Sequence, residues 1–454
     1  MQRYTFFSAV LFLSYATFLS GGTVLPAKGQ ERLADQTPKT DERLRKDLVE
    51  RRERVFAQME DDSILIVRGN HSKGHLRGIF RQFDNFYYLT GINDPGGVVL
   101  LKKAAGETSS RLYFPRQNKE KILWDAQTLG VDGARQVSAI DDTRDEVSFQ
   151  REFEPLLENV KTVYYDSEEN HDEFGERLEG LALSLKPASR IVHSLRRVKT
   201  AYEVDLIRRA AMISCEGHKE LMRSAKPGLN EFELQAILEY VFRFNGAQDT
   251  GYSSIVGSGP NSCILHWSRN DRYTRNNEVV LVDAGAEYKN YTADVTRTFP
   301  VNGKFTERQR EIYAIVLKAN TEATKLVKPG VSTGEVFAKA NDEIFKGLKE
   351  LGMVETRREV RRFLMHGIGH SVGLNVHDVG GLGVLEEGMV ITIEPGIYIA
   401  NEAIGIRIED NILVTKDGYE NLSINLPRTA DEVEDLMKEE GMRFSRYMIN
   451  NVNK

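Results

Sequence analysis

Two neighbouring strand-like segments each hold one aspartate inside a run of aliphatic or β-branched residues. The first segment, residues 279–285, has the sequence VVLVDAG and contains Asp283, and the second, residues 291–297, contains Asp294. If the chain between them turns at residues 288–289, the two aspartates face each other directly across an antiparallel pair. Tyr-Lys is an unfavourable sequence for a tight hairpin turn, so the spacing alone supports this register.

A second pair of segments farther along the chain repeats this arrangement with two glutamates. An aliphatic strand ends at Glu394, and the returning segment has the sequence IGIRIE and ends at Glu409. A turn at residues 401–402 places the two glutamates opposite each other. Side chains alternate between the two faces of a strand, so Arg407 shares the face of Glu409.

Two pairs of facing carboxylates impose a clear chemical requirement. Like charges that face each other across neighbouring strands repel, and buried carboxylates must share protons or bind cations. The alternative is two solvated hairpin surfaces that carry acids by coincidence. A solvated face would show several polar residues, whereas these acids are embedded in aliphatic strands. The two pairs therefore predict a buried cation site.

Histidines supply the remaining candidate ligands. His366 and His370 have the i, i+4 spacing of a helical metal pair, but glycines lie between them and favour a loop over a helical HExxH motif. His377 follows shortly afterwards, and His266 precedes the first acidic pair. A lone histidine is more often structural. Four of the nine histidines lie in or beside glycine-rich segments here, which indicates a functional site.

In order and spacing, these segments resemble the aminopeptidase P/prolidase group of the pita-bread metallopeptidases. The N-terminal half is similar too, most clearly over RQFDNFYYLTG at residues 81–91, so that the resemblance covers roughly residues 40–440. It implies an α/β (α+β) chain in which an N-terminal α/β accessory domain precedes a pita-bread catalytic domain with a pseudo-twofold duplication. The motifs that carry the resemblance lie at residues 255–259, 263–266, 282–285, 294–300, 365–370, 376–380, 393–396 and 405–410.

The resemblance also implies a ligand set for two divalent metal ions. The family uses two aspartates, one histidine and two glutamates, which correspond to Asp283, Asp294, His370, Glu394 and Glu409. Asp294 and Glu409 would bridge the two ions. A site with four carboxylates and one imidazole suits Mn²⁺, the family's usual metal, with Co²⁺, Fe²⁺ or Zn²⁺ as alternatives.

The implied activity is that of an aminopeptidase that releases the N-terminal residue from peptides with proline in the second position. Glu394 corresponds to the general base that acts on a metal-activated water. His266 and His377 correspond to histidines that orient the substrate, transfer protons and stabilise the oxyanion. His366 and Arg407 complete the candidate catalytic set, and Arg407 is suited to hold acids or a substrate carboxylate in place.

Proline-containing substrates require an apolar slot, because a bond to proline lacks the N–H that a general peptidase recognises. Tyr398, Tyr252 and Trp267 are candidate wall residues for this slot. Their interpretation as ordinary core aromatics stays open. Substrate contacts are thus expected from His266, His377, Arg407 and Tyr398.

Several other proteins compete with this interpretation. Prolidase, which cleaves only dipeptides, is the nearest alternative, because loops that the sequence does not define set the length preference. Methionine aminopeptidase lacks the large N-terminal domain. Creatinase has the architecture without metal ions, so the complete ligand set argues against it. From a different class, a non-catalytic peptide-binding protein on this scaffold would typically lose ligands.

Long amphipathic helices are predicted around these motifs, and they too are duplicated. The junction at residues 225–230 precedes a helix with Glu233 near its start, and a similar junction at residues 327–332 precedes a helix with Glu335. Each junction combines a helix stop, a turn and a capping-box-like start. The helices are expected at about residues 201–224, 230–245, 306–327 and 332–351.

The first half of the chain is predicted to form an α/β domain of its own. The pattern of short strands and helices changes to long amphipathic helices near residue 200. We therefore predict an N-terminal domain at residues 41–197 and a catalytic domain at residues 198–445. In the first, helices are expected at residues 41–59 and 174–185, and strands at residues 64–67, 86–90, 98–101 and 163–165.

Bulk properties fit a soluble two-domain protein. The chain has 454 residues, 41% of them apolar and 28% charged, which is too long for one ordinary core. A net charge of −6 and the absence of a basic run with interleaved aromatics give no indication of nucleic-acid binding. The two cysteines, Cys215 and Cys263, are too few for a disulfide framework. An exported protein could pair them, but each lies in an apolar context that favours a buried thiol. By resemblance alone, we expect a homo-oligomer.

The N-terminus has the pattern of a secretory signal peptide. Arg3 precedes a mostly apolar stretch at residues 6–19, and Ser-Gly-Gly follows at residues 20–22. The stretch is short for a membrane span, which needs about 20 apolar residues. We expect a signal peptide at residues 1–22, a flexible leader at residues 23–40, and a periplasmic or secreted protein with no stable membrane association after cleavage. An uncleaved membrane anchor is the alternative.

Overall fold

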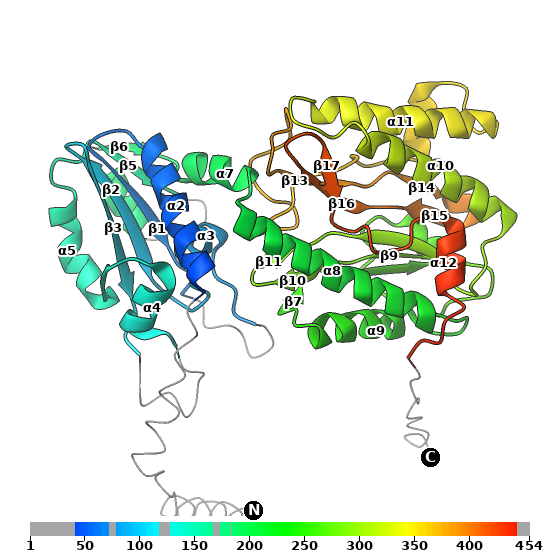
Figure 1. The fold of residues 1–454 in the computed structure, drawn as a ribbon, viewed down its shortest axis with the longest axis horizontal. Coiled ribbons are helices and arrows are strands. Elements are labelled where there is room, and N and C mark those ends of the chain that lie inside the picture. The colour runs from blue at the N-terminus through cyan, green and yellow to red at the C-terminus, as the bar shows by residue number, and fades with distance from the viewer. Residues whose placement is uncertain (1–40, 72–78, 118–127, 167–172, 182, 443–454) are drawn as a thin grey trace, which may run out of the picture.

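The computed structural model describes residues 41–71, 79–117, 128–166, 173–181 and 183–442, which form two lobes (Figure 1). The predicted signal peptide and leader, residues 1–40, lie outside the described residues. None of the described helices combines the length and the apolar character that a bilayer crossing requires. The predicted boundary at residue 197 falls between α7 (Ser189–Arg197) and α8 (Ala201–Ser224).

The N-terminal lobe is built on a six-stranded mixed sheet with the strand order β4-β3-β2-β1-β5-β6. β1, β2 and β3 are antiparallel neighbours, whereas β4, β5 and β6 each run parallel to the strand that they join. The strands are β1 (Ser63–Arg68), β2 (Val98–Ala104), β3 (Glu107–Phe114), β4 (Asp142–Asp145), β5 (Thr162–Tyr165) and β6 (Ser184–Lys186).

Helices cover both faces of this sheet. Alternate side chains of a strand face opposite sides, so Leu65 packs with α2, α3, α4 and α7, while Ile64 packs with α5 and α6. The helix expected at residues 174–185 is shorter than predicted, because the chain passes from α6 into β6. The helices are α2 (Glu42–Gln58), α3 (Asp84–Thr90), α4 (Gly130–Ser138), α5 (Phe149–Leu156) and α6 (Glu173–Glu179).

One predicted strand of this lobe is a helix. Residues 86–90, expected to be extended, form most of α3, which has Asp84 in its first turn and ends at Gly91 in the left-handed region (φ 68°). The Thr90 hydroxyl donates a hydrogen bond to the Phe86 carbonyl one turn earlier, at 2.7 Å. All residues from position 85 to position 90 are buried. Because the residues of this segment are buried on every side, the spacing of its apolar side chains shows neither the helical period nor the alternation of a strand. The sequence alone therefore does not distinguish the two structures.

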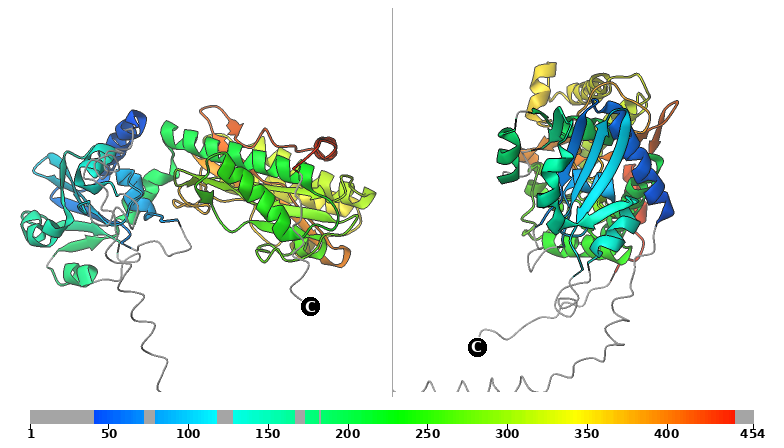
Figure 2. Two further views of the ribbon diagram at one scale, coloured as in Figure 1. Left: turned by 90° about the horizontal axis from the view of Figure 1, so that it is seen from below. Right: turned by 90° about the vertical axis from the view of Figure 1, so that its left-hand side faces the viewer.

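Two pairs of long helices enclose the strands of the C-terminal lobe, where the sequence predicts them. Both predicted capping boxes are present, one formed by Asn230 with Glu233 and the other by Ser332 with Glu335. In Figure 1 the strands lie between the two pairs, and in the first view of Figure 2 α8 and α9 cross in front of the strands. α8 packs on α9 (Glu231–Phe244), and α10 (Glu307–Thr324) packs on α11 (Thr333–Glu350).

The strands of this lobe form three three-stranded sheets and one two-stranded ribbon. Their orders are β11-β10-β7, β12-β9-β8, β13-β16-β17 and β14-β15. A short helix, α12 (Ala430–Leu436), follows the last strand. The strands are β7 (Asp249–Thr250), β8 (Ile255–Ser258), β9 (Val279–Asp283), β10 (Ala286–Tyr288), β11 (Tyr291–Thr292), β12 (Thr296–Pro300), β13 (Val390–Ile393), β14 (Gly396–Ile399), β15 (Ile404–Arg407), β16 (Asp410–Val414) and β17 (Tyr419–Asn421).

The first acidic hairpin differs in register from the prediction. β12 pairs with β9 so that Asp283 lies opposite Thr296 rather than opposite Asp294. The turn occurs at Lys289 and Asn290, whose φ angles of 48° and 65° are those of a type I′ turn. Since the register moves by two residues, an even number, Asp294 still shares a strand face with Asp283.

The second acidic hairpin has the predicted register. β14 pairs with β15 so that Gly396 lies opposite Arg407, and β13 pairs with β16 in the same register. Glu394 therefore lies opposite Glu409. The connection is the short 3₁₀ helix η4 (Ala400–Glu402), which contains the predicted turn.

Candidate metal centre and active site

A cavity of about 480 Å³ in the C-terminal lobe collects the residues that the sequence singles out. Apolar side chains, among them Ile255, Leu265 and Val376, form part of its wall. Tyr252 lines it as well, whereas Tyr398 and Trp267 do not. The candidate ligands and catalytic residues on its surface are Asp283, Asp294, His370, Glu394, Glu409, His266, His366, His377 and Arg407.

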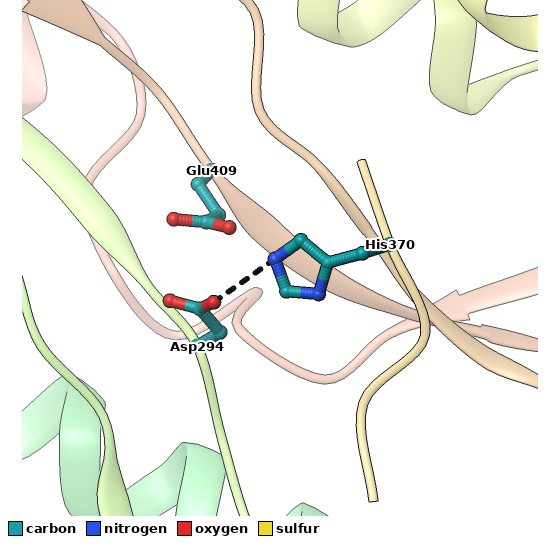
Figure 3. Close-up of side chains that lie close together, drawn as sticks. All are labelled: Asp294, His370 and Glu409. Carbon is teal, nitrogen blue, oxygen red and sulfur yellow. Dashed lines mark ion pairs between the residues drawn. The ribbon is translucent and has the colours of Figure 1, made fainter. Parts of the chain in front are cut away.

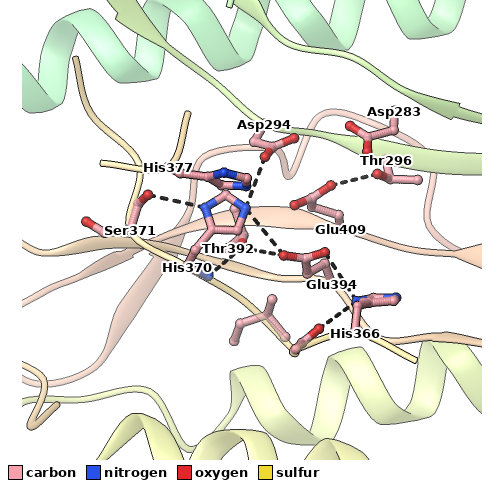
Figure 4. Close-up of polar contacts among 12 residues, drawn as sticks. Asp283, Asp294, Thr296, His366, His370, Ser371, His377, Thr392, Glu394 and Glu409 are labelled. Atoms are coloured by element: carbon pink, nitrogen blue, oxygen red, sulfur yellow. Dashed lines mark hydrogen bonds and ion pairs between the residues drawn. The ribbon is translucent and has the colours of Figure 1, made fainter. Parts of the chain in front are cut away.

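Three of the candidate ligands lie within reach of one ion. Asp294, His370 and Glu409 each offer a ligand atom, and these atoms all lie within 4.8 Å of one another (Figure 3). His370 Nε2 lies 3.2 Å from Asp294 Oδ2 and 3.3 Å from Glu394 Oε1 (Figure 4). One imidazole nitrogen thus faces carboxylates from both hairpins.

Asp283 is held at this cluster by two other side chains. The Tyr252 hydroxyl lies 2.6 Å from Asp283 Oδ1 and also contacts the Asp294 carboxylate. Arg407 donates to Asp283 Oδ2 at 2.5 Å and to the Tyr398 hydroxyl at 2.8 Å. The same hydroxyl lies 2.8 Å from His366 Nε2. Tyr398, buried behind the cavity wall, therefore connects two predicted catalytic residues instead of forming the wall itself.

Each of the four acids lies where a strand ladder is interrupted. Asp283 is the last residue of β9, Asp294 precedes β12, Glu394 separates β13 from β14, and Glu409 separates β15 from β16. At the break beside Asp294 the Asn411 side chain replaces the missing ladder partner. Its Oδ1 accepts from the Asp294 N–H at 3.0 Å, and its Nδ2 donates to the Asp294 carbonyl. Backbone contacts therefore fix the aspartate.

The cluster contains more negative charge than the protein neutralises. Burial raises the pKa of Asp283 to about 6 and the pKa of Glu394 to about 7, although the charges of Arg407 and His370, respectively, act in the opposite direction. Burial and the neighbouring acids raise the pKa of Glu409 well above its usual range. Without cations, the acids therefore tend to keep protons.

Asp294 and His370 form the exception and act as a pair. Burial alone would raise the pKa of Asp294, but the hydrogen bond and charge of His370, together with the hydrogen bonds of Tyr252 and Asp283, outweigh burial and lower it. Burial alone would lower the pKa of His370, but the Asp294 hydrogen bond and charge raise it to about 9. The protonated imidazole of His370 supplies the acids with positive charge that a bound divalent cation would supply instead.

Two observations indicate that the cluster fits a cation. Glu409 is 1% exposed, and its Oε1 has no hydrogen-bond partner among the described residues, while its Oε2 accepts from the Thr296 hydroxyl at 2.6 Å. A buried carboxylate oxygen left without a donor is costly unless a cation binds it. His370 Nδ1 lies 3.2 Å from the Ser371 carbonyl, an arrangement that leaves Nε2 free to bind a metal.

Two further histidines stand beside the acids. The His377 ring packs edge-on against His370, with centroids 4.3 Å apart and an interplanar angle of 84°. His366 Nδ1 lies 3.7 Å from Glu394 Oε2. Burial lowers the pKa values of both His377 and His366, that of His366 to about 4, so both rings are neutral at physiological pH. Neutral imidazoles are able to accept or donate a proton during a reaction.

Family models match both lobes of this chain. A model described as the N-terminal domain of aminopeptidase P matches residues 48–164, and one described as metallopeptidase family M24 matches residues 205–416. The Xaa-Pro aminopeptidase of Haemophilus influenzae is 36% identical over 425 residues, which cover 86% of this chain and 96% of that protein. The chain belongs to the Xaa-Pro aminopeptidase family. As a member, it is a metallopeptidase, a hydrolase that depends on divalent metal ions.

Other Xaa-Pro aminopeptidases and solved structures agree with this membership. The enzyme of Escherichia coli is 36% identical over 394 residues, 79% of this chain and 89% of that protein. A Pseudomonas aeruginosa aminopeptidase structure matches with a TM-score of 0.82 and 35% identity, over 87% of this chain and 98% of that one. Escherichia coli aminopeptidase P in a complex with substrate matches with a TM-score of 0.80, 33% identity and the same coverage. The predicted fold class is confirmed.

The sequence does not predict the role of one buried residue near the site of this Xaa-Pro aminopeptidase family member. Glu231, the first residue of α9, is fully buried and accepts hydrogen bonds from the segment at residues 258–272, which carries His266. A glutamate in the first turn of a helix is typical of an exposed helix start, so the sequence gives no sign of burial. The donors are Ser258 N and Oγ (both 2.7 Å), Trp267 Nε1 (2.8 Å), Asn261 Nδ2 (3.0 Å) and Arg272 N (3.1 Å).

Proposed function

We propose that this chain releases the N-terminal residue from peptides whose second residue is proline, with two divalent ions held by five of its side chains. The observation that carries the proposal is the convergence of these side chains in one cavity, with an unpartnered carboxylate oxygen among them. The proposed ligands are Asp283, Asp294, His370, Glu394 and Glu409.

The composition of the cluster supports two ions rather than one. Four carboxylates and one imidazole offer more ligand atoms than the octahedral shell of a single ion accepts. Among the described residues, Arg407 is the one lysine or arginine that forms an ion pair with a proposed ligand carboxylate. One divalent ion would therefore leave the cluster negatively charged. A site dominated by carboxylates favours Mn²⁺, and Co²⁺, Fe²⁺ and Zn²⁺ remain candidates.

Bound divalent ions would lower the pKa of a shared water and stabilise charge on the attacked carbonyl oxygen. Glu394 is the proposed acceptor of the proton from the attacking water, and its carboxylate faces the cavity beside His370. His266 and His377 on the cavity wall are suited to orient the substrate and to donate to the oxyanion. Arg407 and His366, joined through Tyr398, keep Asp283 and Glu394 in position.

The preference for proline rests on the apolar part of the cavity and on the family. Ile255, Leu265, Val376 and Tyr252 offer a surface on which a pyrrolidine ring is able to pack. A tertiary amide has no N–H that needs a hydrogen-bond acceptor, so an apolar wall leaves no donor of the bond to proline unpaired. The relatives are named Xaa-Pro aminopeptidases, and the Escherichia coli enzyme was also solved with the inhibitor Pro-Leu.

A peptide panel tests the proposal against prolidase, the second candidate. The purified protein is treated with a chelator, reloaded separately with Mn²⁺, Co²⁺, Fe²⁺ or Zn²⁺, and given Ala-Pro, Ala-Pro-Ala and Ala-Ala-Ala. We expect metal-dependent release of alanine from Ala-Pro-Ala and little cleavage of Ala-Ala-Ala. Strict cleavage of Ala-Pro would support prolidase. Binding of Ala-Pro-Ala without cleavage under any metal would support a peptide-binding protein.

We also propose that the protein is exported and assembles as a homo-oligomer, on the strength of residues 1–22 and of the family resemblance. N-terminal sequencing of the mature protein tests export. A first residue shortly after position 22 supports signal cleavage, whereas an intact N-terminus recovered with the membrane fraction supports an uncleaved anchor. Light scattering of the purified protein tests assembly, and a monomer mass would contradict it.

A further inference from the structure

A second cavity adjoins the catalytic cavity on its His366 side. It has a volume of about 650 Å³ and lies between α11 and the 3₁₀ helix η3 (Arg357–Arg362). His366 belongs to the walls of both cavities. In Figure 4, His366 lies on the side of the acid cluster that faces the yellow helical segments. The two cavities are therefore neighbours, with the His366 side chain between them.

The lining of this second cavity is basic. It includes two arginines and no carboxylate. Arg357 is already engaged, since it pairs with Asp342 and its guanidinium carbon lies 4.8 Å from the centroid of the Phe345 ring. Arg361 forms no ion pair with a described carboxylate. One guanidinium in the cavity is thus fixed in place, and the other is available to a ligand.

We propose that this second cavity is a subsite for a carboxylate on the leaving-group side of the substrate, bound by Arg361. The inference rests on the proposed aminopeptidase function. An aminopeptidase holds the amino end of its substrate at the reacting centre, so every later residue must leave the catalytic cavity. On the proposed exit past His366, a guanidinium with free donors is suited to bind a carboxylate through two parallel hydrogen bonds. The carboxylate belongs either to an acidic side chain or to the free C-terminus of a short peptide.

The expected effect is modest because Arg361 is exposed. An ion pair in a half-open cavity changes kcat/KM by about fivefold, which corresponds to the upper end for exposed pairs. A general attraction between an acidic peptide and the four arginines of η3 would give a similar preference. Only a comparison between an arginine that lines the cavity and one that does not separates the two explanations. Arg358 lies on the same short helix, carries the same charge and does not line the cavity.

The test uses matched peptides on the Mn²⁺-loaded protein. One series is Ala-Pro-Gly-Glu-amide against Ala-Pro-Gly-Gln-amide, which reports on a side-chain carboxylate. The other is Ala-Pro-Gly-Gln with a free C-terminus against its amide, which reports on the terminal carboxylate. The readout is the ratio of kcat/KM within each pair, so that a change common to both peptides cancels. The proteins are the unmodified chain, Arg361→Ala, Arg361→Lys and the control Arg358→Ala.

We expect the unmodified protein to prefer the carboxylate peptide in at least one series. Arg361→Ala should abolish that preference, Arg361→Lys should keep part of it, and Arg358→Ala should leave it unchanged. The series in which the preference is lost identifies the source of the carboxylate. Equal ratios in the unmodified protein, or equal losses in Arg361→Ala and Arg358→Ala, would overturn the subsite while leaving the proposed function intact. Failure to cleave any of the peptides would overturn both.

Discussion

Asp294 illustrates how much of the proposed chemistry depends on single side chains. Its carboxylate contacts His370 Nε2 at 3.2 Å and the Tyr252 hydroxyl, and its backbone is held by Asn411. Together these contacts hold the negatively charged carboxylate between the two acidic hairpins. The residue has no role in the hydrophobic core. Its environment therefore serves the cation site rather than the stability of the fold.

Replacement of this charge by an isosteric amide should destroy the site and spare the fold. For Asp294→Asn we expect loss of at least about a hundredfold in kcat, because even the loss of a residue that only supports a metal ligand costs ten- to a hundredfold. Metal binding should weaken in parallel, as measured by calorimetric titration with Mn²⁺. The far-ultraviolet circular dichroism should not change. Turnover equal to that of the unmodified protein would refute the bridging role.

Residues at this scale divide into those that a sequence pattern identifies and those that it does not. The acids were identifiable because a charge inside an aliphatic strand is unusual. Glu231 and Asn411 were not, since a glutamate at a helix start and an asparagine near the beginning of a strand occur in many exposed positions. Glu231 and Asn411 are structural because segments distant in the sequence form hydrogen bonds with them. No local sequence pattern predicts such contacts.

The two hairpins show what local sequence determines at the scale of elements. In the second hairpin, alternation along residues 404–409 excludes a shift by one residue, which would turn its isoleucines to the wrong face, and the predicted turn at residues 401–402 sets the register among those that remain. In the first hairpin a shift by two residues keeps every side chain on its face, so the pattern did not exclude it. The turn at Lys289 and Asn290 decides between the two registers through positive φ angles. Asparagine tolerates such angles better than most residues.

The segment that carries His266 should be sensitive to its anchor on α9. Trp267→Phe keeps an aromatic side chain but removes the five-membered ring of the indole, with the N–H that donates to Glu231 at 2.8 Å. A hydrogen bond to a buried carboxylate contributes about 1.5–3 kcal/mol, so part of the segment should loosen. We expect KM for Ala-Pro-Ala to rise severalfold while metal binding is unchanged, as measured by steady-state kinetics and Mn²⁺ titration.

Tyr273→Phe provides the control for this variant. Tyr273 lies shortly after the same segment and is 59% exposed, so removal of its hydroxyl should leave KM unaltered. An equal rise in KM for both variants would indicate general loosening rather than loss of the Glu231 contact. An unchanged KM for Trp267→Phe would show that Glu231 does not position His266.

At the scale of the whole molecule, the two lobes meet close to the site. Arg196 on α7 pairs with Asp378 at 2.6 Å, and Lys199, in the connection to α8, pairs with the same carboxylate at 3.3 Å. Asp378 directly follows His377. The N-terminal lobe thus contributes to the position of a histidine in the catalytic cavity, which the pattern of short strands and helices in that lobe does not reveal.

Two buried acids of the metal-free cluster should each contribute less stability as pH rises. The pKa of Asp283 is raised from 3.8 to about 6 and that of Glu394 from 4.5 to about 7, mainly by burial. A carboxyl whose pKa is raised by folding stabilises the fold below its unfolded pKa, and this stability is lost as pH rises through the folded pKa. The lowered pKa of Asp294 acts oppositely below this window, and burial of His366 and His218, which lowers the pKa of each to about 4, acts oppositely within it.

We therefore expect Tm of the chelator-treated protein to fall more, or rise less, between pH 4 and pH 7 than Tm of a Glu394→Gln variant, by about 2–4 °C for each kcal/mol that Glu394 contributes. Mn²⁺ should raise Tm more at pH 7.5 than at pH 5, because the ions replace protons at the ligands. Differential scanning calorimetry at several pH values checks this. The Asp294→Asn variant, titrated in the same way, should gain less from Mn²⁺. The same change of Tm with pH in the metal-free unmodified protein and in metal-free Glu394→Gln would contradict the assignment.

Anomalous diffraction from crystals grown with Mn²⁺, recorded at the manganese absorption edge, tests the cation pair most directly. We predict two peaks about 3.5–4 Å apart, the separation typical of paired catalytic ions. Both peaks should lie among the side chains of Asp283, Asp294, His370, Glu394 and Glu409, with Asp294 and Glu409 between them. A protein that cleaves Ala-Pro-Ala while its crystals show no peak among these five residues would contradict the account.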